Sequence, residues 1–373
     1  MRILTVTTNF GFGPSSKLYS IIKELLKMGY KEITFCGNGE SINFFKTNFG
    51  NRLEYIECDT DEIRSESFLK IVDIKNYELL INVMNLNIPK IQRDTNLNVK
   101  SVFVDSLSWM WEKPLDGINE YDIYFVQNAF IDPNNLSQYK NIQTINPIIN
   151  TEGITKTKDF KNNKILLNFA GIVTPYENDV FFKKYMLFYL KLFSKIPNID
   201  KYEIDCACNM TQKKWIESNN RFDYNVTFKV MSHKEFLSAS CEASRIFTTP
   251  GLTFYLESLE LGLKPHYFLP SNYSQALLLE KYNQISGNCN TLSKYGYLFS
   301  TDELLEESEG VTKVREAFSN ISTRYKEEIF DNIISYINEG SVYESNNEIQ
   351  YKEESGIRSI IRIMLEKGLL KGR

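Results

Sequence analysis

The segment Thr248–Gln275, TTPGLTFYLESLELGLKPHYFLPSNYSQ, carries the residue types best suited to hold a charged ligand. An apolar run, RIFTT, leads into Pro250 and Gly251, and a helical pattern begins near Leu252. Gly251 lets a ligand approach the backbone closely, and the N–H groups and dipole at a helix start favour an anion. A proline just before or in the first helical turn removes no needed donor. The turn therefore predicts a phosphate-binding site.

Polar side chains surround this turn. Thr249 and Thr253 offer hydroxyl groups, and Glu257 follows Thr253 by one helical turn on the same face. A carboxylate there accepts hydrogen bonds from ribose hydroxyls. The segment thus predicts a site for an anion beside a carboxylate that can bind ribose hydroxyls. The alternative is an ordinary strand-turn-helix of a Rossmann-like domain.

The elements that must position these residues follow a repeated strand-helix pattern. RILTVTT, the helical KLYSIIKELLKMGY and KEITFCG form a β-α-β unit, and such units build parallel sheets. The pattern lapses between 146 and 163 and restarts at KILLNFAGI. We therefore expect an α/β protein with two Rossmann-like, doubly wound parallel-sheet domains facing across a cleft. These are an N-terminal domain over 1–150 and a C-terminal domain over 164–340, with a terminal helix over 341–373 packing back on the body. Ligands of such sheets bind at the carboxyl ends of the strands.

Composition excludes several classes of protein. A chain of 373 residues with net charge -4 fits two globular domains and gives no sign of nucleic-acid binding. The N-terminus lacks the apolar core of a secretion signal and no window is apolar enough for a membrane span, so we expect a cytoplasmic protein with no integral membrane segment. The six cysteines suit reduced, buried thiols, and even the closely spaced Cys206 and Cys208 have too few histidines in the chain to complete a metal site. We expect no metal.

These residues carry a resemblance. The stretch GLTFYLESLELGLKPHYFLPSNYSQ resembles the nucleotide-sugar motif of GT-B glycosyltransferases, the superfamily of the plant and macrolide UDP-sugar transferases and the bacterial lipid II transferase. The matching positions are Gly251, Glu257, Gly262, Pro265, Pro270 and Gln275. The sequence departs twice: Thr249-Pro250 replaces a frequent histidine, and Ser274 stands where an acidic residue precedes the terminal glutamine.

The resemblance implies a role for each matched position. Gly251, with Leu252, Thr253 and Thr249, would bind the diphosphate, Glu257 the ribose, and Gln275 with Ser274 the donor sugar. Gly171, in the loop after the first strand of the second domain, would lie near the phosphates. Met231 and Ser232 fall in the segment whose backbone reads the nucleotide base. We expect His233 to be a surface or capping residue and His266 to be structural.

The N-terminal loop NFGFGPSSK resembles the acceptor-side loop of the same superfamily. Gly11, Gly13, Ser15 and Ser16 would form a turn that holds a phosphate or the acceptor, with Lys17 as an anion partner. A tight glycine turn, with Ser15 or Ser16 capping the next helix, explains the same residues. Many members carry a histidine base here, but residues 1–232 contain none.

A replacement base is expected at the end of an N-terminal strand. Asp105 ends the apolar run KSVFVD, and Trp109 and Trp111 follow in a position to stack on an acceptor. We interpret Asp105 as the general base or an acceptor-orienting carboxylate. The alternative is a helix cap with the tryptophans in the core. Glu112 and Asp59 are weaker candidates.

The sequence therefore predicts a metal-independent glycosyltransferase that moves a sugar from a nucleotide-sugar co-substrate, UDP-linked, to a small-molecule or cell-envelope acceptor, with no other cofactor. Two alternatives stay open: a binding or accessory subunit that has lost its base, and a sugar-nucleotide epimerase of the same fold. A homodimer or an accessory partner also stays open.

Overall fold

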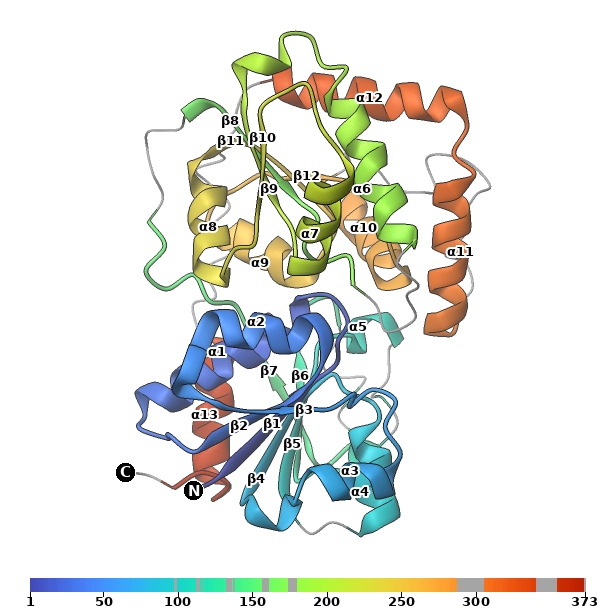
Figure 1. Cartoon of the computed structure of the whole chain (residues 1–373). Helices are drawn as coiled ribbons and strands as arrows, with labels where there is room; N and C mark the ends of the chain where they lie inside the picture. The colour runs from blue at the N-terminus through green and yellow to red at the C-terminus, as the bar shows by residue number, and fades with distance from the viewer. Residues whose placement is uncertain are drawn as a thin grey trace. The chain divides into compact units, whose positions relative to one another are not determined.

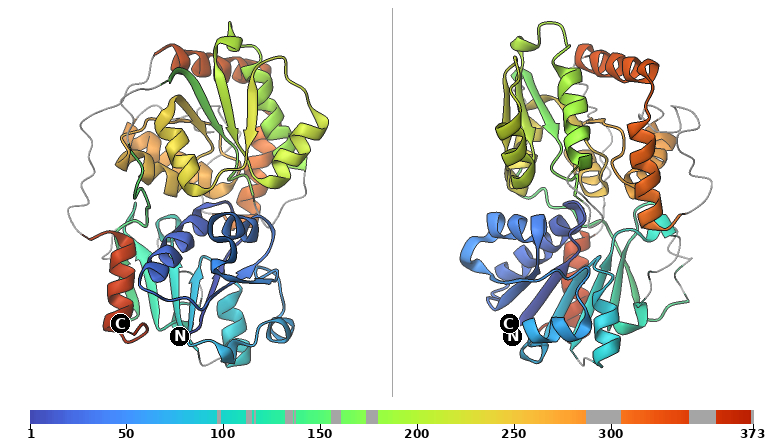
Figure 2. Two further views of the ribbon diagram at one scale, coloured as in Figure 1. Left: turned by 60° about the vertical axis from the view of Figure 1, so that its left-hand side comes forward. Right: turned by 45° about the vertical axis from the view of Figure 1, so that its right-hand side comes forward.

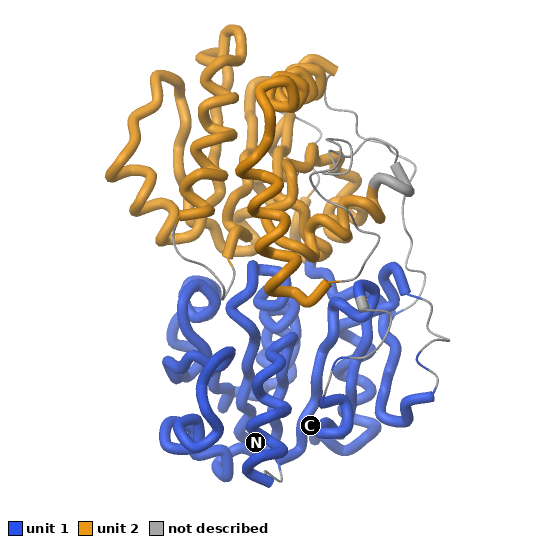
Figure 3. The backbone as a smooth tube through the Cα atoms, turned by 90° about the vertical axis from the view of Figure 1, so that its right-hand side faces the viewer, with its two compact units in different colours: residues 1–150, 350–373 blue, residues 151–349 orange. Residues whose placement is uncertain are grey.

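The computed structural model describes residues 1–96, 99–111, 115, 117–131, 136, 138–155, 161–173, 180–286, 305–339 and 354–371. The chain divides into two compact units (Figure 3): unit 1 comprises Met1–Asn150 with Gln350–Arg373, and unit 2 comprises Thr151–Ile349. Each unit contains one parallel sheet with helices between most successive strands, so the predicted pair of doubly wound units is confirmed. Among the helices of the described residues, none has the length and apolar character needed to cross a bilayer.

The sheet of unit 1 has seven strands in the order β3-β2-β1-β4-β5-β6-β7 (Figure 1). Its strands are β1 (Ile3–Thr7), β2 (Ile33–Gly37), β3 (Glu54–Glu57), β4 (Leu79–Val83), β5 (Lys100–Asp105), β6 (Ile123–Gln127) and β7 (Ile142–Ile145). Its helices are α1 (Gly13–Lys27), α2 (Gly39–Phe49), α3 (Ser65–Ile71), α4 (Ile88–Thr95), α5 (Ser108–Trp111) and α13 (Gly356–Glu366), with 3-10 turns at Gly50–Arg52, Ile74–Asn76 and Ile118–Glu120.

Two apolar cores cover the two faces of this sheet. One contains the buried residues of α1, α2 and α13 together with Ile3 of β1, and the other contains Leu4 and Val6 of β1 with the buried residues of α3 and α4. Alternate residues of a strand point to opposite faces, so a strand covered on both sides reads as continuously apolar. The sequences of β4, β5 and β6 show this pattern.

The sheet of unit 2 has five strands in the order β10-β9-β8-β11-β12. Its strands are β8 (Lys161–Asn168), β9 (Glu203–Ala207), β10 (Val226–Lys229), β11 (Ala243–Thr248) and β12 (His266–Tyr267). Its helices are α6 (Val180–Phe193), α7 (Met210–Asn219), α8 (His233–Glu242), α9 (Leu252–Glu260), α10 (Tyr273–Ser286), α11 (Glu307–Ser319) and α12 (Thr323–Asn338), with a 3-10 turn at Ile199–Lys201.

Different side chains fill the two sides of this second sheet. On one side, α8 and α9 pack Leu237, Cys241 and Phe254 against the strands. On the other, aromatic rings gather: Phe169 stacks on Phe268, with ring centroids 5.1 Å apart, and rings of α6 join them. The strands that lead into the candidate site of this unit are therefore packed against apolar and aromatic side chains on both sides.

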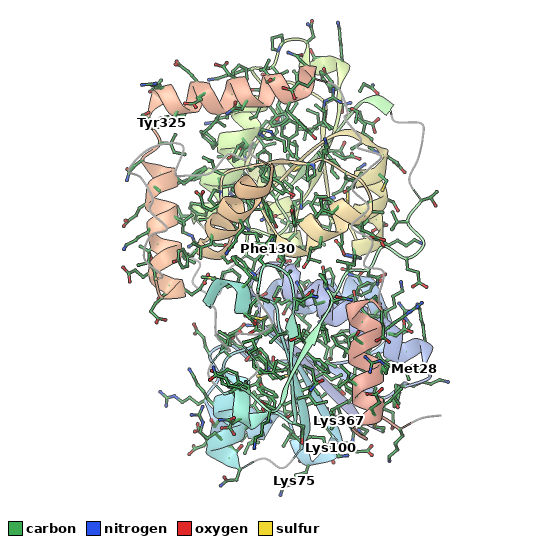
Figure 4. The ribbon with its side chains drawn as sticks, turned by 180° about the vertical axis from the view of Figure 1, so that it is seen from behind. Met28, Lys75, Lys100, Phe130, Tyr325 and Lys367 are labelled. Atoms are coloured by element: carbon green, nitrogen blue, oxygen red, sulfur yellow. The ribbon has the colours of Figure 1, made fainter. Side chains whose placement is uncertain are left out.

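The last helix, α13, belongs to unit 1, where it packs beside α1 and β7 (Figure 2). Asn146 donates a hydrogen bond to the Glu354 carbonyl over 2.9 Å at its start. At its end, Lys100, labelled near Lys367 in Figure 4, donates to the Gly368 carbonyl over 2.8 Å. Both ends of the helix are thus tied to strands or loops of the first 150 residues.

Gly356→Ala is expected to displace α13. A Cβ atom at this position would lie 2.0 Å from the carbonyl oxygen of Asn146, a backbone atom that cannot rotate away. Overpacking of this kind costs about 1–3 kcal/mol or more. We expect a lower melting temperature for Gly356→Ala than for Gly171→Ala, whose nearest atom would lie at 3.8 Å. Equal melting temperatures by calorimetry would contradict this packing.

Candidate functional site

The turn between β11 and α9 is held at the carboxyl edge of the unit 2 sheet. Thr248, the last residue of β11, pairs with Asn168 of β8 on one side and Tyr267 of β12 on the other. Asn168 donates through Nδ2 to the Thr248 hydroxyl over 3.0 Å, and its carbonyl accepts the Thr249 N–H over 3.2 Å. The turn that follows is therefore anchored to strands on both sides.

Gly251 is the N-cap of α9 and leaves open space beside its Cα. Its φ of -163° is extended backbone that any residue adopts, and a Cβ added there would meet no atom within 4 Å. Neither backbone conformation nor packing of the described residues therefore requires glycine. A ligand that approaches the backbone would require it, since glycine also has no side chain to occupy the start of the helix.

Glu257 lies inside α9 and contacts His233. Its side chain is 3% exposed, and its Oε1 lies 2.8 Å from Nε2 of His233, which is 7% exposed. His233 is the first residue of α8, after the N-cap Ser232. The expectation of a surface or capping histidine was wrong, because its ring turns inward to meet a buried carboxylate.

The residues that follow β12 form a second helix start. Asn272 accepts the Gln275 N–H through its side chain over 3.0 Å and also accepts the Ser274 hydroxyl. Gln275 Oε1 accepts both the N–H and the hydroxyl of Ser271, at 2.8 and 2.9 Å. The amide of Gln275 is thereby held in one orientation by Ser271, with its carbonyl oxygen engaged.

Gly171 and Met231 lie in two further loops of unit 2, after β8 and after β10. A Cβ at Gly171 would lie 3.8 Å from the Thr249 hydroxyl, so the loop after β8 runs beside the turn after β11. Met231 lies between β10 and α8, partly buried against the core. Unit 2 thus brings the positions Gly171, Thr249 and Gly251 together at one edge.

In unit 1 the glycine loop ends in a helix start without a polar cap. Helix α1 begins at Gly13 after the N-cap Phe12, and Gly11 has a φ of 61°, in the left-handed region that favours glycine. Ser15 and Ser16 therefore lie within the first turn and do not cap it. Lys17 is 2% exposed, inside the unit.

Asp105 is fully buried at the end of β5 and accepts three hydrogen bonds. Its Oδ1 accepts the N–H groups of Leu107 and Ser108 at 2.7 and 2.9 Å, and its Oδ2 accepts the Tyr124 hydroxyl at 2.7 Å. Burial raises the pKa of this carboxyl, and the hydrogen bonds from Ser108 and Tyr124 oppose that shift. These contacts fit the alternative in which Asp105 caps the start of the following helix, α5.

Trp109 is also buried, and its Nε1 donates to the Ser106 carbonyl over 3.0 Å. Its ring meets Phe130 edge to face. Glu112 and the side chain of Trp111 lie outside the described residues.

Asp61 is a carboxylate at the same edge that the sequence reasoning missed. Its Oδ2 accepts the Asn9 N–H over 2.8 Å, and its Oδ1 accepts Nδ2 of Asn85 over 3.0 Å. The loops after β1, β3 and β4 therefore meet at this side chain, which remains partly exposed. Burial raises the pKa of its carboxyl. Its signal in the sequence was an acidic run after a strand, DTDE, in which only Asp59 was weighed.

Solved structures of similar fold include glycosyltransferases and a putative epimerase. The spinosyn rhamnosyltransferase complexed with spinosyn aglycone matches at a TM-score of 0.52 and 9% identity, over 98% of this chain and 100% of that one. A putative UDP-N-acetylglucosamine 2-epimerase from Listeria monocytogenes matches at a TM-score of 0.51 and 10% identity, over 100% of this chain and 98% of that one. The glycotransferase of kitacinnamycin matches at a TM-score of 0.50 and 12% identity, over 99% of each chain. No protein-family model and no curated protein sequence matches the chain.

These similarities define the class of the fold. Both units align, over nearly the whole length of this chain, with proteins built from two Rossmann-like domains. The chain has the GT-B fold, as the nucleotide-sugar motif implied, and at these identities the similarity establishes the fold alone. In the described residues no group of three or more His, Cys, Asp or Glu side chains is placed to hold a metal ion.

Asp105→Ala is expected to destabilise unit 1. The change leaves two N–H groups and the Tyr124 hydroxyl without their acceptor in a buried place, at a cost on the order of 3 kcal/mol. The exposed Asp59, changed to alanine, is the matched control and should have an effect within about 0.5 kcal/mol. Chemical denaturation measures both. Similar free energies of unfolding for the two variants would contradict a structural role for Asp105.

Proposed function

We propose that this protein is a glycosyltransferase that moves a sugar from a nucleotide-sugar, UDP-linked, to a small-molecule or cell-envelope acceptor. The observation that carries the proposal is the β11–α9 turn, where a helix start with open space at Gly251 lies less than about two helical turns from the buried carboxylate of Glu257. A diphosphate suits the first feature and a ribose the second. The GT-B fold and the matching order of the sequence motif support the same ligand.

In this proposal unit 2 holds the donor. The N–H groups at the start of α9, with the hydroxyls of Thr249 and Thr253, would stabilise the charge that develops on the leaving diphosphate. Gly171, in the adjacent loop, would leave room for the phosphates. Gln275, oriented by Ser271, would donate to the sugar through its Nε2, for which no hydrogen bond is found among the described residues. Transfer would then proceed without a metal.

Unit 1 would supply the acceptor side and the base. The attacking hydroxyl must lose a proton as the glycosidic bond forms. Asp105, the base expected from the sequence, is enclosed and accepts three hydrogen bonds, whereas Asp61 is partly exposed at the same strand edge. The exposure of Asp61 supports it as the base, with Asp105 shaping the loop that follows β5. The turn from Gly11 to Ser16 would contact the acceptor.

Two other functions remain candidates. The similarity to the putative epimerase keeps a sugar-nucleotide epimerase in view, and it would use the same donor site in unit 2. A binding or accessory subunit would also keep that site but would release no UDP. Nucleotide binding is common to all three functions. Transfer of the sugar to an acceptor with release of UDP identifies the transferase, epimerisation of the nucleotide-sugar identifies the epimerase, and a binding subunit catalyses neither reaction.

Gly251→Val is expected to abolish nucleotide binding without destabilising the fold. The added side chain enters space that is empty in the protein but would be occupied by the diphosphate. Isothermal titration with UDP and a panel of UDP-sugars should show binding to the unchanged protein and at least a tenfold loss in the variant. The same ligands should raise the melting temperature of the unchanged protein by mass action.

The contradicting results are distinct. If no nucleotide or nucleotide-sugar binds the unchanged protein, the proposed function fails. If UDP binds Gly251→Val as tightly as the unchanged protein, the ligand lies elsewhere.

Asp61→Asn is expected to reduce turnover by about 10²–10⁴-fold, the usual contribution of a general base. UDP affinity should stay unchanged, since Asp61 belongs to unit 1. The pKa of Asp61 is raised, so kcat/KM of the unchanged protein should rise with pH through a value above 3.8 and then level off. Release of UDP from the UDP-sugar that binds most tightly, with phenols and lipid alcohols as acceptors, measures this. Asp59→Asn is the control, and equal activity of the two variants would exclude Asp61 as the base.

A further inference from the structure

His233 and Glu257 form a buried pair that the nucleotide-sugar motif does not contain. The motif covers Glu257 only, whereas His233 comes 24 residues earlier, on a different helix. Their contact joins the start of α8, after β10, to α9, after β11. The pair therefore connects the segment expected to read the base with the carboxylate expected to bind the ribose.

The position of His233 is fixed by its own helix. Ser232 and Glu235 form a capping box, in which Glu235 accepts the Ser232 N–H over 2.7 Å and the Ser232 hydroxyl accepts the Glu235 N–H over 3.3 Å. His233 follows the cap directly, so its backbone has little freedom. The ring of His233 is only 7% exposed and contacts Glu257, so its surroundings restrict the side chain as well.

The two oxygens of Glu257 are not equivalent. Oε1 contacts His233 Nε2, while no hydrogen bond reaches Oε2 from the described residues. A buried carboxylate is stable only with a partner, and here the partner engages one oxygen and orients the other. A single preorganised acceptor suits one hydroxyl of a ribose, because the cost of ordering the side chain is met before the ligand binds.

We propose that His233 is a positioning residue that orients Glu257 for one ribose hydroxyl, so that the site distinguishes a ribonucleotide from a deoxyribonucleotide. This rests on the proposed binding of a nucleotide. A purely structural pair would stabilise unit 2 and affect all nucleotides equally. A positioning pair changes the preference between nucleotides that differ by one hydroxyl.

The test measures dissociation constants of UDP, 2′-deoxy-UDP and 3′-deoxy-UDP for the unchanged protein, His233→Phe and His233→Gln. Phenylalanine keeps the ring volume without a donor, and the amide nitrogen of glutamine can take the place of Nε2. A hydrogen bond to a charged group contributes roughly 1.5–3 kcal/mol, about 10–100-fold in affinity. We expect the unchanged protein to bind one of the two deoxy nucleotides at least tenfold more weakly than UDP. In His233→Phe this difference in affinity should fall below about threefold. In His233→Gln the tenfold difference should return.

Each other outcome has one meaning. Equal binding of all three nucleotides to the unchanged protein overturns the proposal without requiring any variant. If His233→Phe is folded by circular dichroism and weakens all three nucleotides by the same factor, the pair is structural and the proposal is overturned. If His233→Phe does not fold, the proposal is decided by His233→Gln, which must retain the deoxy penalty, and by Glu257→Gln, which must lose it. If UDP itself does not bind the unchanged protein, the proposed function fails as well.

Discussion

Parallel pairing of β11 between β8 and β12 is the constraint on which the candidate site depends. Because all strands of the sheet run the same way, their carboxyl ends lie at one edge and every following loop emerges there. Asn168 and Thr248 are paired residues at that edge, and their side chains bond to each other. The turn at Gly251 is therefore anchored to the sheet, and aromatic rings pack beneath that sheet.

The same edge shows how buried polar groups are accommodated. Glu257 is almost enclosed but lies against His233, and Gln275 is buried with its carbonyl oxygen bonded twice to Ser271. Enclosed groups that are already oriented lose little freedom when a ligand arrives. In unit 1, Asp105 shows the opposite case, because its three hydrogen bonds engage both oxygens within the fold. Two buried carboxylates of this protein therefore differ in how many of their oxygens the described residues engage.

Much of the fold could be predicted because its signals are local. Continuous apolar runs marked β4, β5 and β6, and the helical spacing of Leu18, Ile21 and Leu25 marked α1. β7 has no such local signal, since Ile142–Ile145 is short and mostly only partly buried at the sheet edge. The start of α1 was also misjudged: Pro14 sits comfortably in the first turn, so the helix begins at Gly13 and the serines fall inside it.

The sequence by itself determined the α/β class, the two sheet units and the set of polar residue types in the segment from Thr248 to Gln275, because these depend on periodicity and on residues close together in the chain. Tertiary structure decided which side chains meet. His233 contacts Glu257 across 24 residues, Asp61 is held by Asn9 across 52, and α13 returns to unit 1 after the whole of unit 2. Contacts between distant residues depend on how strands and helices pack, and no local spacing encodes that packing. The residue types of the β11–α9 turn thus suggested a kind of ligand, and the packing around the turn decided which side chains contact one another there.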